Sequence, residues 1–106
     1  MKIVLFRSRL RPDAGDAYGA MARRTLELAR AMPGFISFKQ FSAPDGERLS
    51  VIEFESDEAI AAWYRHPEHL AAQQRGRDSF YEDYQIHVCS PTRSYGFTRK
   101  DPGTRA

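Results

Sequence analysis

Short runs of β-branched and aromatic residues alternate along this chain with longer stretches of helical spacing. Residues 2–10 begin as a continuous apolar run and end in alternation, which is typical of a strand whose first part is buried on both faces. In the alternating part, Arg7 and Arg9 share one face and Phe6 lies on the other. The pattern therefore predicts a first strand over residues 2–10.

A helix is predicted after this strand. Apolar residues recur at steps of three and four from Ala14 to Met32, which places them on one side of a helix. Asp13 is a typical N-cap residue, because its carboxylate can accept a hydrogen bond from a backbone N–H of the first turn. Pro33 and Gly34 should end the helix.

Two further strands should form a hairpin. Residues 35–41 and 49–55 are rich in aromatic and β-branched side chains. Pro44 and the pair Asp45 and Gly46 lie between them, and this combination is typical of a tight turn in which glycine takes a positive φ. We therefore expect residues 35–41 and 49–55 to pair in antiparallel fashion.

The second helical region contains a proline that should divide it in two. Ser56 is the predicted N-cap of the first part. Pro67 is compatible with a first helical turn but not with a helix interior, so we expect a break at His66 and a second short helix from Pro67 to about Arg75. Gly76 is the predicted C-terminal cap.

Residues 80–90 are predicted to form the last strand, which Pro91 ends. Alternation along this strand places Tyr81 and Tyr84 on opposite faces. The sequence alone does not say which of the two tyrosines faces the helices.

The elements therefore follow the order β-α-β-β-α-β, which predicts an α+β, ferredoxin-like fold with one antiparallel four-stranded sheet. We expect one domain over residues 1–91 and a partly flexible C-terminal extension over residues 92–106. Helices cover only one face of such a sheet. The strands carry apolar residues at adjacent positions, such as Val51 and Ile52, whose side chains point to opposite faces of the sheet. The face away from the helices should therefore also be buried. A homodimer that packs sheet on sheet is the simplest cover.

Composition narrows the class of protein. The 106 residues, 42% apolar and 28% charged, suit a single soluble domain. Sixteen basic and fourteen acidic residues are mixed along the chain, which argues against a nucleic-acid surface. The single cysteine, Cys89, excludes an internal disulfide and favours a reducing compartment. The apolar run over residues 3–6 is too short for a signal peptide or a membrane span, so we expect a cytoplasmic protein without membrane association.

Most of the side chains capable of chemistry lie between Trp63 and Arg77. His66 and His69 with one glutamate are too few ligands for a metal site, so no metal is predicted. His69 lies near the positive end of the short helix, which favours a neutral imidazole and suits a general base. A histidine that only packs and hydrogen-bonds at the helix break remains the alternative. A tryptophan such as Trp63 is more often a core residue than a ligand contact, and if a pocket exists Trp63 could form a flat wall for an aromatic ligand.

The chain resembles the antibiotic biosynthesis monooxygenase family of the dimeric α+β barrel superfamily over residues 2–90. The resemblance rests on segments 6–10, 32–35, 62–63, 66–69 and 71–73, the hairpin up to Glu55, and Gly76 and Arg77 leading to Tyr81 and Tyr84. It implies a homodimer whose two sheets form a barrel, with a pocket between sheet and helices in each protomer.

The resemblance also implies an activity. Members of this family are similar to monooxygenases that need no cofactor and oxidise phenols or quinols with O2. We therefore expect oxidation of a small phenolic or quinol-like compound, with His69 as base, Trp63, Phe6 and Tyr84 lining the site, and Arg7 available to a carboxylate or phenolate oxygen.

Two alternatives remain open. The same pocket would serve a non-catalytic or stress-related dimer that holds a small apolar ligand. Other members degrade haem, and they place an iron-ligating histidine ten residues after the helix tryptophan and an asparagine near the end of the first strand. Gln73 occupies the first position here and residues 5–10 contain no asparagine, so the cofactor-free reaction is favoured over haem degradation.

Overall fold

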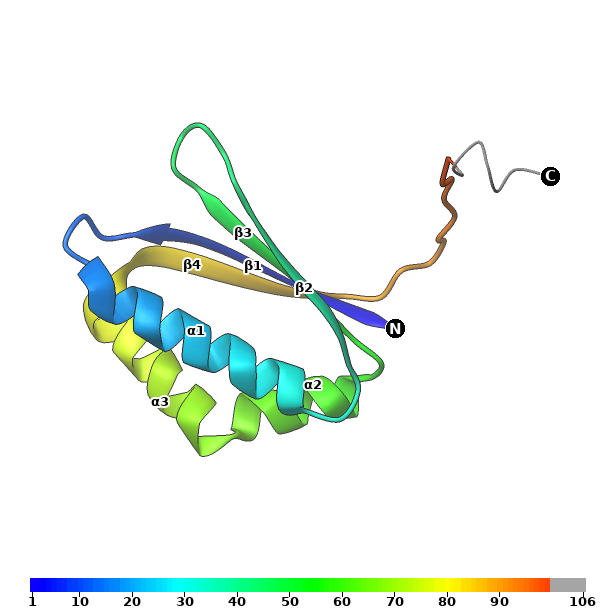
Figure 1. The fold of residues 1–106 in the computed structure, drawn as a ribbon, viewed down its shortest axis with the longest axis horizontal. Coiled ribbons are helices and arrows are strands. Elements are labelled where there is room, and N and C mark those ends of the chain that lie inside the picture. Colours follow the sequence, from blue (N-terminus) through cyan, green and yellow to red (C-terminus); the bar gives the residue numbers. More distant parts are fainter. Residues whose placement is uncertain (100–106) are drawn as a thin grey trace.

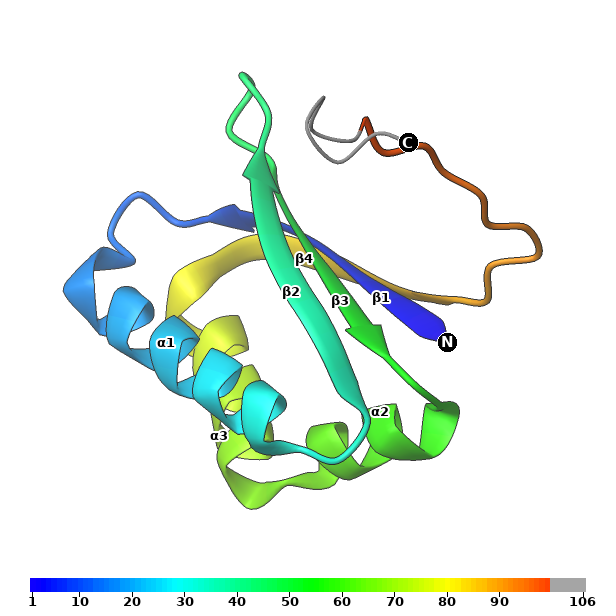
Figure 2. The same cartoon turned by 45° about the vertical axis from the view of Figure 1, so that its right-hand side comes forward.

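The computed structural model describes residues 1–99, which form four strands, three α-helices and one π-helical turn. The elements in chain order are β1 (Lys2–Leu10), α1 (Gly15–Ala31), β2 (Phe35–Ser42), β3 (Arg48–Phe54), α2 (Asp57–Arg65), α3 (Pro67–Arg75), the π-helical turn η1 (Gly76–Phe80) and β4 (Tyr81–Cys89). The strands form one sheet in the order β2-β3-β1-β4 with antiparallel neighbours. The three α-helices lie on the same side of it (Figures 1 and 2). The predicted ferredoxin-like α+β fold is confirmed.

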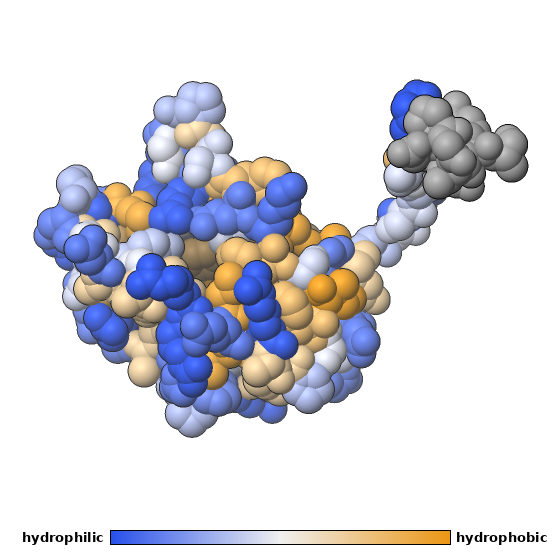
Figure 3. All heavy atoms as spheres, viewed as in Figure 1, coloured by the Kyte–Doolittle hydropathy of each residue, from blue (hydrophilic) through white to orange (hydrophobic). Residues whose placement is uncertain are grey.

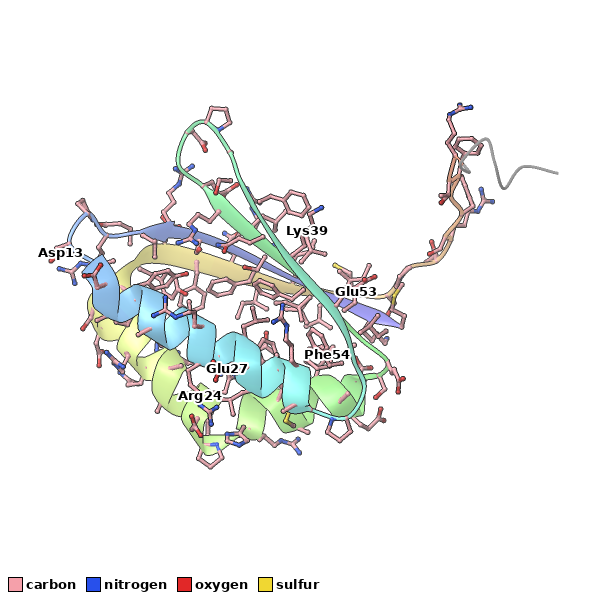
Figure 4. All side chains as sticks on the ribbon, in the orientation of Figure 1. Asp13, Arg24, Glu27, Lys39, Glu53 and Phe54 are labelled. Atoms are coloured by element: carbon pink, nitrogen blue, oxygen red, sulfur yellow. The ribbon has the colours of Figure 1, made fainter. Side chains whose placement is uncertain are left out.

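The core lies between the sheet and the helices. Val4 and Phe54 are fully buried there, together with Ile52 and Trp63. The Phe54 ring lies 5.4 Å from Trp63, centroid to centroid, so β3 and α2 meet through two large aromatic side chains. In Figure 4, Phe54 projects from β3 toward the helices.

The helix break occurs where the sequence predicts it. Ser56 caps α2 by accepting a hydrogen bond from the backbone N–H of Ala59 at 3.1 Å. His66 ends α2 and caps α3, because its Nδ1 accepts from the backbone N–H of Glu68 at 3.2 Å. Pro67 begins α3, where its missing N–H costs no helical hydrogen bond. α2 and α3 therefore form two short helices joined at one residue.

One of the predicted helix caps is wrong, and another has an unexpected conformation. Asp13 does not cap α1: its carboxylate pairs with Arg11 at 3.2 Å, and the helix begins two residues later. Gly76 is the C-cap residue of α3, as predicted, but its φ is −58° rather than left-handed, and the chain continues into η1. The glycine is required for space instead, since a Cβ there would lie 2.7 Å from Cε2 of the Tyr81 ring.

A β-bulge changes the faces of the last strand. Arg9 pairs with Asp83 and Leu10 with Tyr81, so β4 contains one extra residue between these pairs. The prediction that Tyr81 and Tyr84 point to opposite faces is therefore wrong. Both rings lie on the helix side, with centroids 5.6 Å apart.

The hairpin between β2 and β3 is confirmed, with Gly46 at a φ of +92° in the turn. The sheet face away from the helices carries apolar residues, including Leu5 paired with Val51, and no element of residues 1–99 covers it. Phe41 is 48% exposed. A sheet-on-sheet dimer, which would cover this face, stays a prediction.

The segment after β4 contains no helix or strand in residues 90–99. Tyr95 and Phe97 in it are strongly exposed. Residues 100–106 of the predicted C-terminal extension lie outside the described residues. No helix of residues 1–99 combines the length and apolarity that a bilayer span requires.

Candidate functional site

A cavity of about 130 Å³ lies between the helix-facing side of the sheet and helices α1, α2 and α3. A hollow between α1 and the sheet is visible in Figure 3. Its aromatic walls are formed by Phe6, Tyr18, Phe38, Trp63, Tyr64, Tyr81 and Tyr84. No Asp, Glu, Lys or Arg side chain lines the cavity. An apolar cavity of roughly 150 Å³ accommodates benzene, so this cavity suits a single ring.

Three elements supply the walls through their periodicity. Alternation along β1 turns Phe6 toward the helices. The apolar stripe of α1 contributes Tyr18 and Thr25 at helical spacing, and the bulge in β4 adds Tyr81 beside Tyr84. The Phe6 ring lies 5.4 Å from each of these two tyrosine rings.

His69 lies flat against Trp63 in the cavity wall. Their ring centroids are 4.3 Å apart and their planes are inclined by 25°. Both side chains are buried. The break at His66 makes this contact possible, because it lets α3 turn back over the last turn of α2.

A bidentate ion pair holds α3 against α1 beside this contact. Arg24 of α1 donates from Nε to Glu68 at 2.7 Å and from Nη2 to the second oxygen at 2.8 Å. Arg24 also pairs with Glu27, one turn further along α1, and both are labelled in Figure 4. Because Glu68 directly precedes His69, this pair helps to fix the start of α3.

Burial lowers the pKa of His69 to about 4. Hydrogen bonding to the carbonyl of Tyr64 acts in the opposite direction, and the charge of His66 lowers the pKa further. The imidazole is therefore neutral at physiological pH. The sequence predicts a neutral imidazole because His69 lies near a helix N-terminus. In the structure the imidazole is neutral mainly because it is buried away from solvent.

Gln73 and the backbone carbonyl of Tyr64 both bear on which nitrogen of His69 carries the proton. The Gln73 Nε2 atom lies 3.1 Å from His69 Nδ1, and donation in this direction places the imidazole proton on Nε2. Rotation of the amide by half a turn would place Oε1 at Nδ1, move the proton to Nδ1 and leave Nε2 with a free lone pair. His69 and Gln73 are four residues apart on α3, so helical spacing would have predicted that their side chains meet.

The indole N–H of Trp63 has no hydrogen-bond acceptor among residues 1–99, although it is buried. An unpaired buried donor costs about 1–3 kcal/mol. A ligand oxygen placed next to the Trp63 Nε1 atom would remove this cost. Trp63 therefore contributes to the cavity wall and carries a buried donor without a partner among residues 1–99.

Tyr64 and Tyr81 in the cavity wall remain protonated. Burial raises the pKa of Tyr64 to about 12, and burial together with the charge and hydroxyl of Tyr18 raises the pKa of Tyr81 well above its ordinary value. Arg77 donates to the Tyr84 hydroxyl at 3.1 Å. The phenols of Tyr64 and Tyr81 can hydrogen-bond a ligand but do not act as bases at neutral pH.

Of the five predicted site residues, His69, Trp63, Phe6 and Tyr84 line the cavity, and Arg7 does not. Arg7 lies at the opposite parity of β1, on the outer face, and donates to both oxygens of Glu47 at 3.0 Å. The sequence prediction of the site did not include several cavity residues, above all Gln73, Tyr18 and Tyr81.

The described residues do not form a metal centre, since no three His, Cys, Asp or Glu side chains of residues 1–99 gather in one place. They also do not fit haem. The imidazole of His69 is stacked on Trp63, and its Nδ1 lies 3.1 Å from Gln73 Nε2. The cavity is smaller than the roughly 300–1,000 Å³ typical of pockets for drug-sized ligands.

Comparison with known proteins identifies the family of this chain. The sequence model of the family described as "Antibiotic biosynthesis monooxygenase" matches residues 1–75. The Uncharacterized protein YqjZ of Bacillus subtilis (strain 168) is 34% identical over 90 residues, which cover 85% of this chain and 78% of that protein. The chain belongs to the antibiotic biosynthesis monooxygenase family. The resemblance seen in the sequence is therefore confirmed.

The name of a second relative of this chain states an activity. The Jasmonate monooxygenase ABM of Pyricularia oryzae (strain 70-15) is 31% identical over 97 residues, covering 89% of this chain. The match spans only 45% of the fungal protein's length.

Solved structures of other monooxygenase-family proteins share the fold. Rv0793 from Mycobacterium tuberculosis superposes with a TM-score of 0.78 at 22% identity, covering 90% of this chain and 98% of that one. SnoaB from Streptomyces nogalater, described as a cofactor-independent oxygenase, gives a TM-score of 0.73 at 12% identity over 88% of this chain and 94% of its own. At these identities the likeness establishes the fold alone.

Proposed function

We propose that this protein is a cofactor-independent monooxygenase that oxidises a single-ring phenol or quinol with O2 in the cavity between sheet and helices. The observation that carries the proposal is the His69–Trp63 pair, a neutral imidazole stacked on an indole whose N–H is unpaired, in the wall of an aromatic cavity. Family membership supports the monooxygenase class, and SnoaB is a structural neighbour described as needing no cofactor.

Binding would use the aromatic walls and the free indole donor. A phenol ring fits the volume of the cavity, and its oxygen would accept a hydrogen bond from Trp63 Nε1. Such a bond strengthens when the phenol becomes a phenolate, because a charged acceptor binds a donor more tightly than a neutral one. Trp63 would therefore stabilise the reactive anion more than the resting substrate.

Proton removal falls to His69. The imidazole needs a free Nε2 lone pair, which the rotated amide of Gln73 would provide by accepting from Nδ1–H. A pKa of about 4 describes His69 in the empty site. A phenolate formed beside the imidazole would raise that pKa, since an opposite charge within about 4–6 Å favours the protonated form.

The chemistry balances without an external reductant. The phenolate passes one electron to O2. The phenoxyl radical and the superoxide formed in this way then combine at a ring carbon. Loss of water then gives the quinone, so one oxygen atom enters the ring and the other leaves as water. The substrate supplies all four electrons that reduce O2.

We also propose that the protein is a homodimer joined through the outer sheet faces, which carry Leu5 and Val51. Exposed apolar surface of this kind in a small domain is best covered by a second copy. The proposed location is the reducing cytoplasm, because Cys89 is the single cysteine and is free.

A ligand-binding protein without turnover is the second candidate. The pKa of about 4 favours it, since a base with so low a pKa gains little from accepting a phenolic proton. Tight binding of phenols without O2 uptake would identify this second function.

The test is O2 uptake by chelator-treated protein with a panel of single-ring phenols and hydroquinones. The His69→Gln variant should lose at least about a hundredfold in rate, the lower end of the range for removal of a general base. His87→Gln is the matched control, because His87 is exposed on β4 and does not line the cavity. Equal activity of His69→Gln and the unaltered protein would remove the base assignment.

A further inference from the structure

Arg48 lies at the edge of the cavity, on the side of the sheet that faces the helices. It is the first residue of β3, where it pairs with Ser8 of β1 and Ser42 of β2. Ser50, two positions along the same strand, lines the cavity, so alternation directs Arg48 to the same face. The Arg48 Cζ atom lies 5.2 Å from the ring centroid of Tyr18, which itself lines the cavity.

Arg48 differs from the other two half-buried arginines of residues 1–99 in having no carboxylate partner. Three arginines of residues 1–99 are half-buried, and they are Arg9, Arg11 and Arg48. Arg9 pairs with Asp45 at 2.9 Å and Arg11 with Asp13 at 3.2 Å. Arg48 has no carboxylate within 4 Å and no side-chain hydrogen bond in the part of the chain that the structure describes. A partly desolvated guanidinium without an anion is an incomplete ion pair.

The charge of Arg48 acts on the cavity wall. Tyr81 lines the cavity, and burial raises its pKa while the positive charge of Arg48 opposes the rise. No carboxylate among the lining residues competes for the guanidinium. An anion at the Tyr18 end of the cavity would therefore meet one cation and no repelling charge.

We propose that Arg48 binds a carboxylate of the ligand, and that the ligand class is a single-ring phenol with a carboxylate on a short side chain. The ring would lie between Trp63 and Phe6, and the side chain would leave the cavity past Tyr18 to reach Arg48. A planar guanidinium matches the two oxygens of a carboxylate. This inference rests on the proposed function for the placement of the ring, and it adds the part of the ligand that determines specificity.

The binding test compares two probes that differ only in charge, para-hydroxyphenylpropanoate and its primary amide. Trp63 is the one tryptophan in the sequence, so intrinsic fluorescence excited at the red edge of its absorption reports binding, with calorimetry as a second readout. The unaltered protein should bind the propanoate about tenfold or more tightly than the amide, as charge-assisted bonds to an arginine imply. Equal affinity for the two probes, or no binding of either, overturns the proposal.

Variants then assign the preference to one residue. Arg48→Gln should abolish the difference between the probes and leave the affinity for the amide unchanged, and Arg48→Lys should retain part of it. Arg23→Gln is the matched control, because Arg23 is exposed on α1 and does not line the cavity. If Arg48→Gln weakens both probes equally, the residue is structural and the proposal is wrong.

The outcomes separate this inference from the monooxygenase proposal. Preference for the propanoate without O2 uptake supports the carboxylate site and contradicts the oxygenase activity. O2 uptake with both probes and no preference between them supports the activity and contradicts the role of Arg48.

Discussion

The imidazole of His69 stacks on the indole of Trp63 with their centroids 4.3 Å apart. This contact joins the last turn of α2 to the first turn of α3, and Pro67 makes it possible by ending one helix and beginning the next. The same contact shields the imidazole from water, which lowers its pKa. Packing and chemistry therefore depend on one pair of rings.

The stability of the protein should fall in mild acid because of His69. Its pKa is about 4 in the folded state and about 6.5 when solvent-exposed, so protonation favours the unfolded chain. This contribution is complete above pH 6.5, is lost as the pH falls from about 6.5 to 4, and amounts to roughly 3 kcal/mol. Urea unfolding of the unaltered protein and of His69→Gln at several pH values measures it. Parallel pH curves for the two proteins would contradict the burial argument.

Replacing Gln73 with Glu should raise the pKa of His69. A carboxylate at this position can only accept from Nδ1–H, which fixes the tautomer with a free Nε2 and favours the charged imidazole. The acid limb of the pH profile for O2 uptake should move to higher pH, with activity at neutral pH retained or increased. Gln74→Glu on the exposed side of α3 is the control. An unchanged profile would argue against His69 as the base.

Trp63→Phe should weaken both phenol binding and the fold. The smaller ring leaves some space in the core, but the change also removes an unpaired buried N–H, so we expect a loss of about 1–2 kcal/mol in the free energy of unfolding. A phenol that uses the indole N–H should lose about fivefold or more in affinity, measured by calorimetry. Tyr64→Phe, which keeps its ring in the wall, serves as comparison. Unchanged phenol affinity would exclude the indole as donor.

Gly76→Ala should destabilise the protein although its backbone conformation is helical. The added Cβ would lie 2.7 Å from Cε2 and 2.9 Å from Cδ2 of Tyr81, so the ring must move. We expect a net loss of about 1–3 kcal/mol together with weaker phenol binding. Gly96→Ala, whose Cβ meets no atom within 4 Å, should change neither property. Thermal unfolding of both variants provides the comparison.

Val51→Lys should prevent dimer formation. Val51 lies opposite Leu5 on the outer face of the sheet, where a second copy would bury the lysine charge. Light scattering after size exclusion should give a dimer for the unaltered protein and a monomer for the variant. Ala20→Lys on the exposed surface of α1 should remain a dimer. A monomeric unaltered protein would contradict the sheet-on-sheet interface.

Local patterns in the sequence were sufficient to predict most of the fold. Alternation, the turn at Gly46 and the break at Pro67 depend on neighbouring residues, and all three agree with the structure. The β-bulge that brings Tyr81 beside Tyr84 depends on pairing between β4 and β1, which strand periodicity does not contain.

The site was predicted in part for the same reason. Trp63, His69 and Phe6 follow from their positions in predicted elements, whereas Arg48 and Tyr18 meet only through the tertiary fold. Arg7 was placed in the site although its parity on β1 assigns it to the outer face. Parity decides which side chains of a strand can reach a cavity, and residue type does not.

Incorporation of isotopically labelled O2 tests the central claim most directly. Chelator-treated protein is mixed with a single-ring hydroquinone under labelled O2, and the product is analysed by mass spectrometry alongside the His69→Gln and His87→Gln variants. We predict one labelled oxygen atom in the product of the unaltered protein and of His87→Gln, and strongly reduced labelled product from His69→Gln. Product without label, or equal labelled product from all three proteins, would contradict oxygenation at the His69–Trp63 pair.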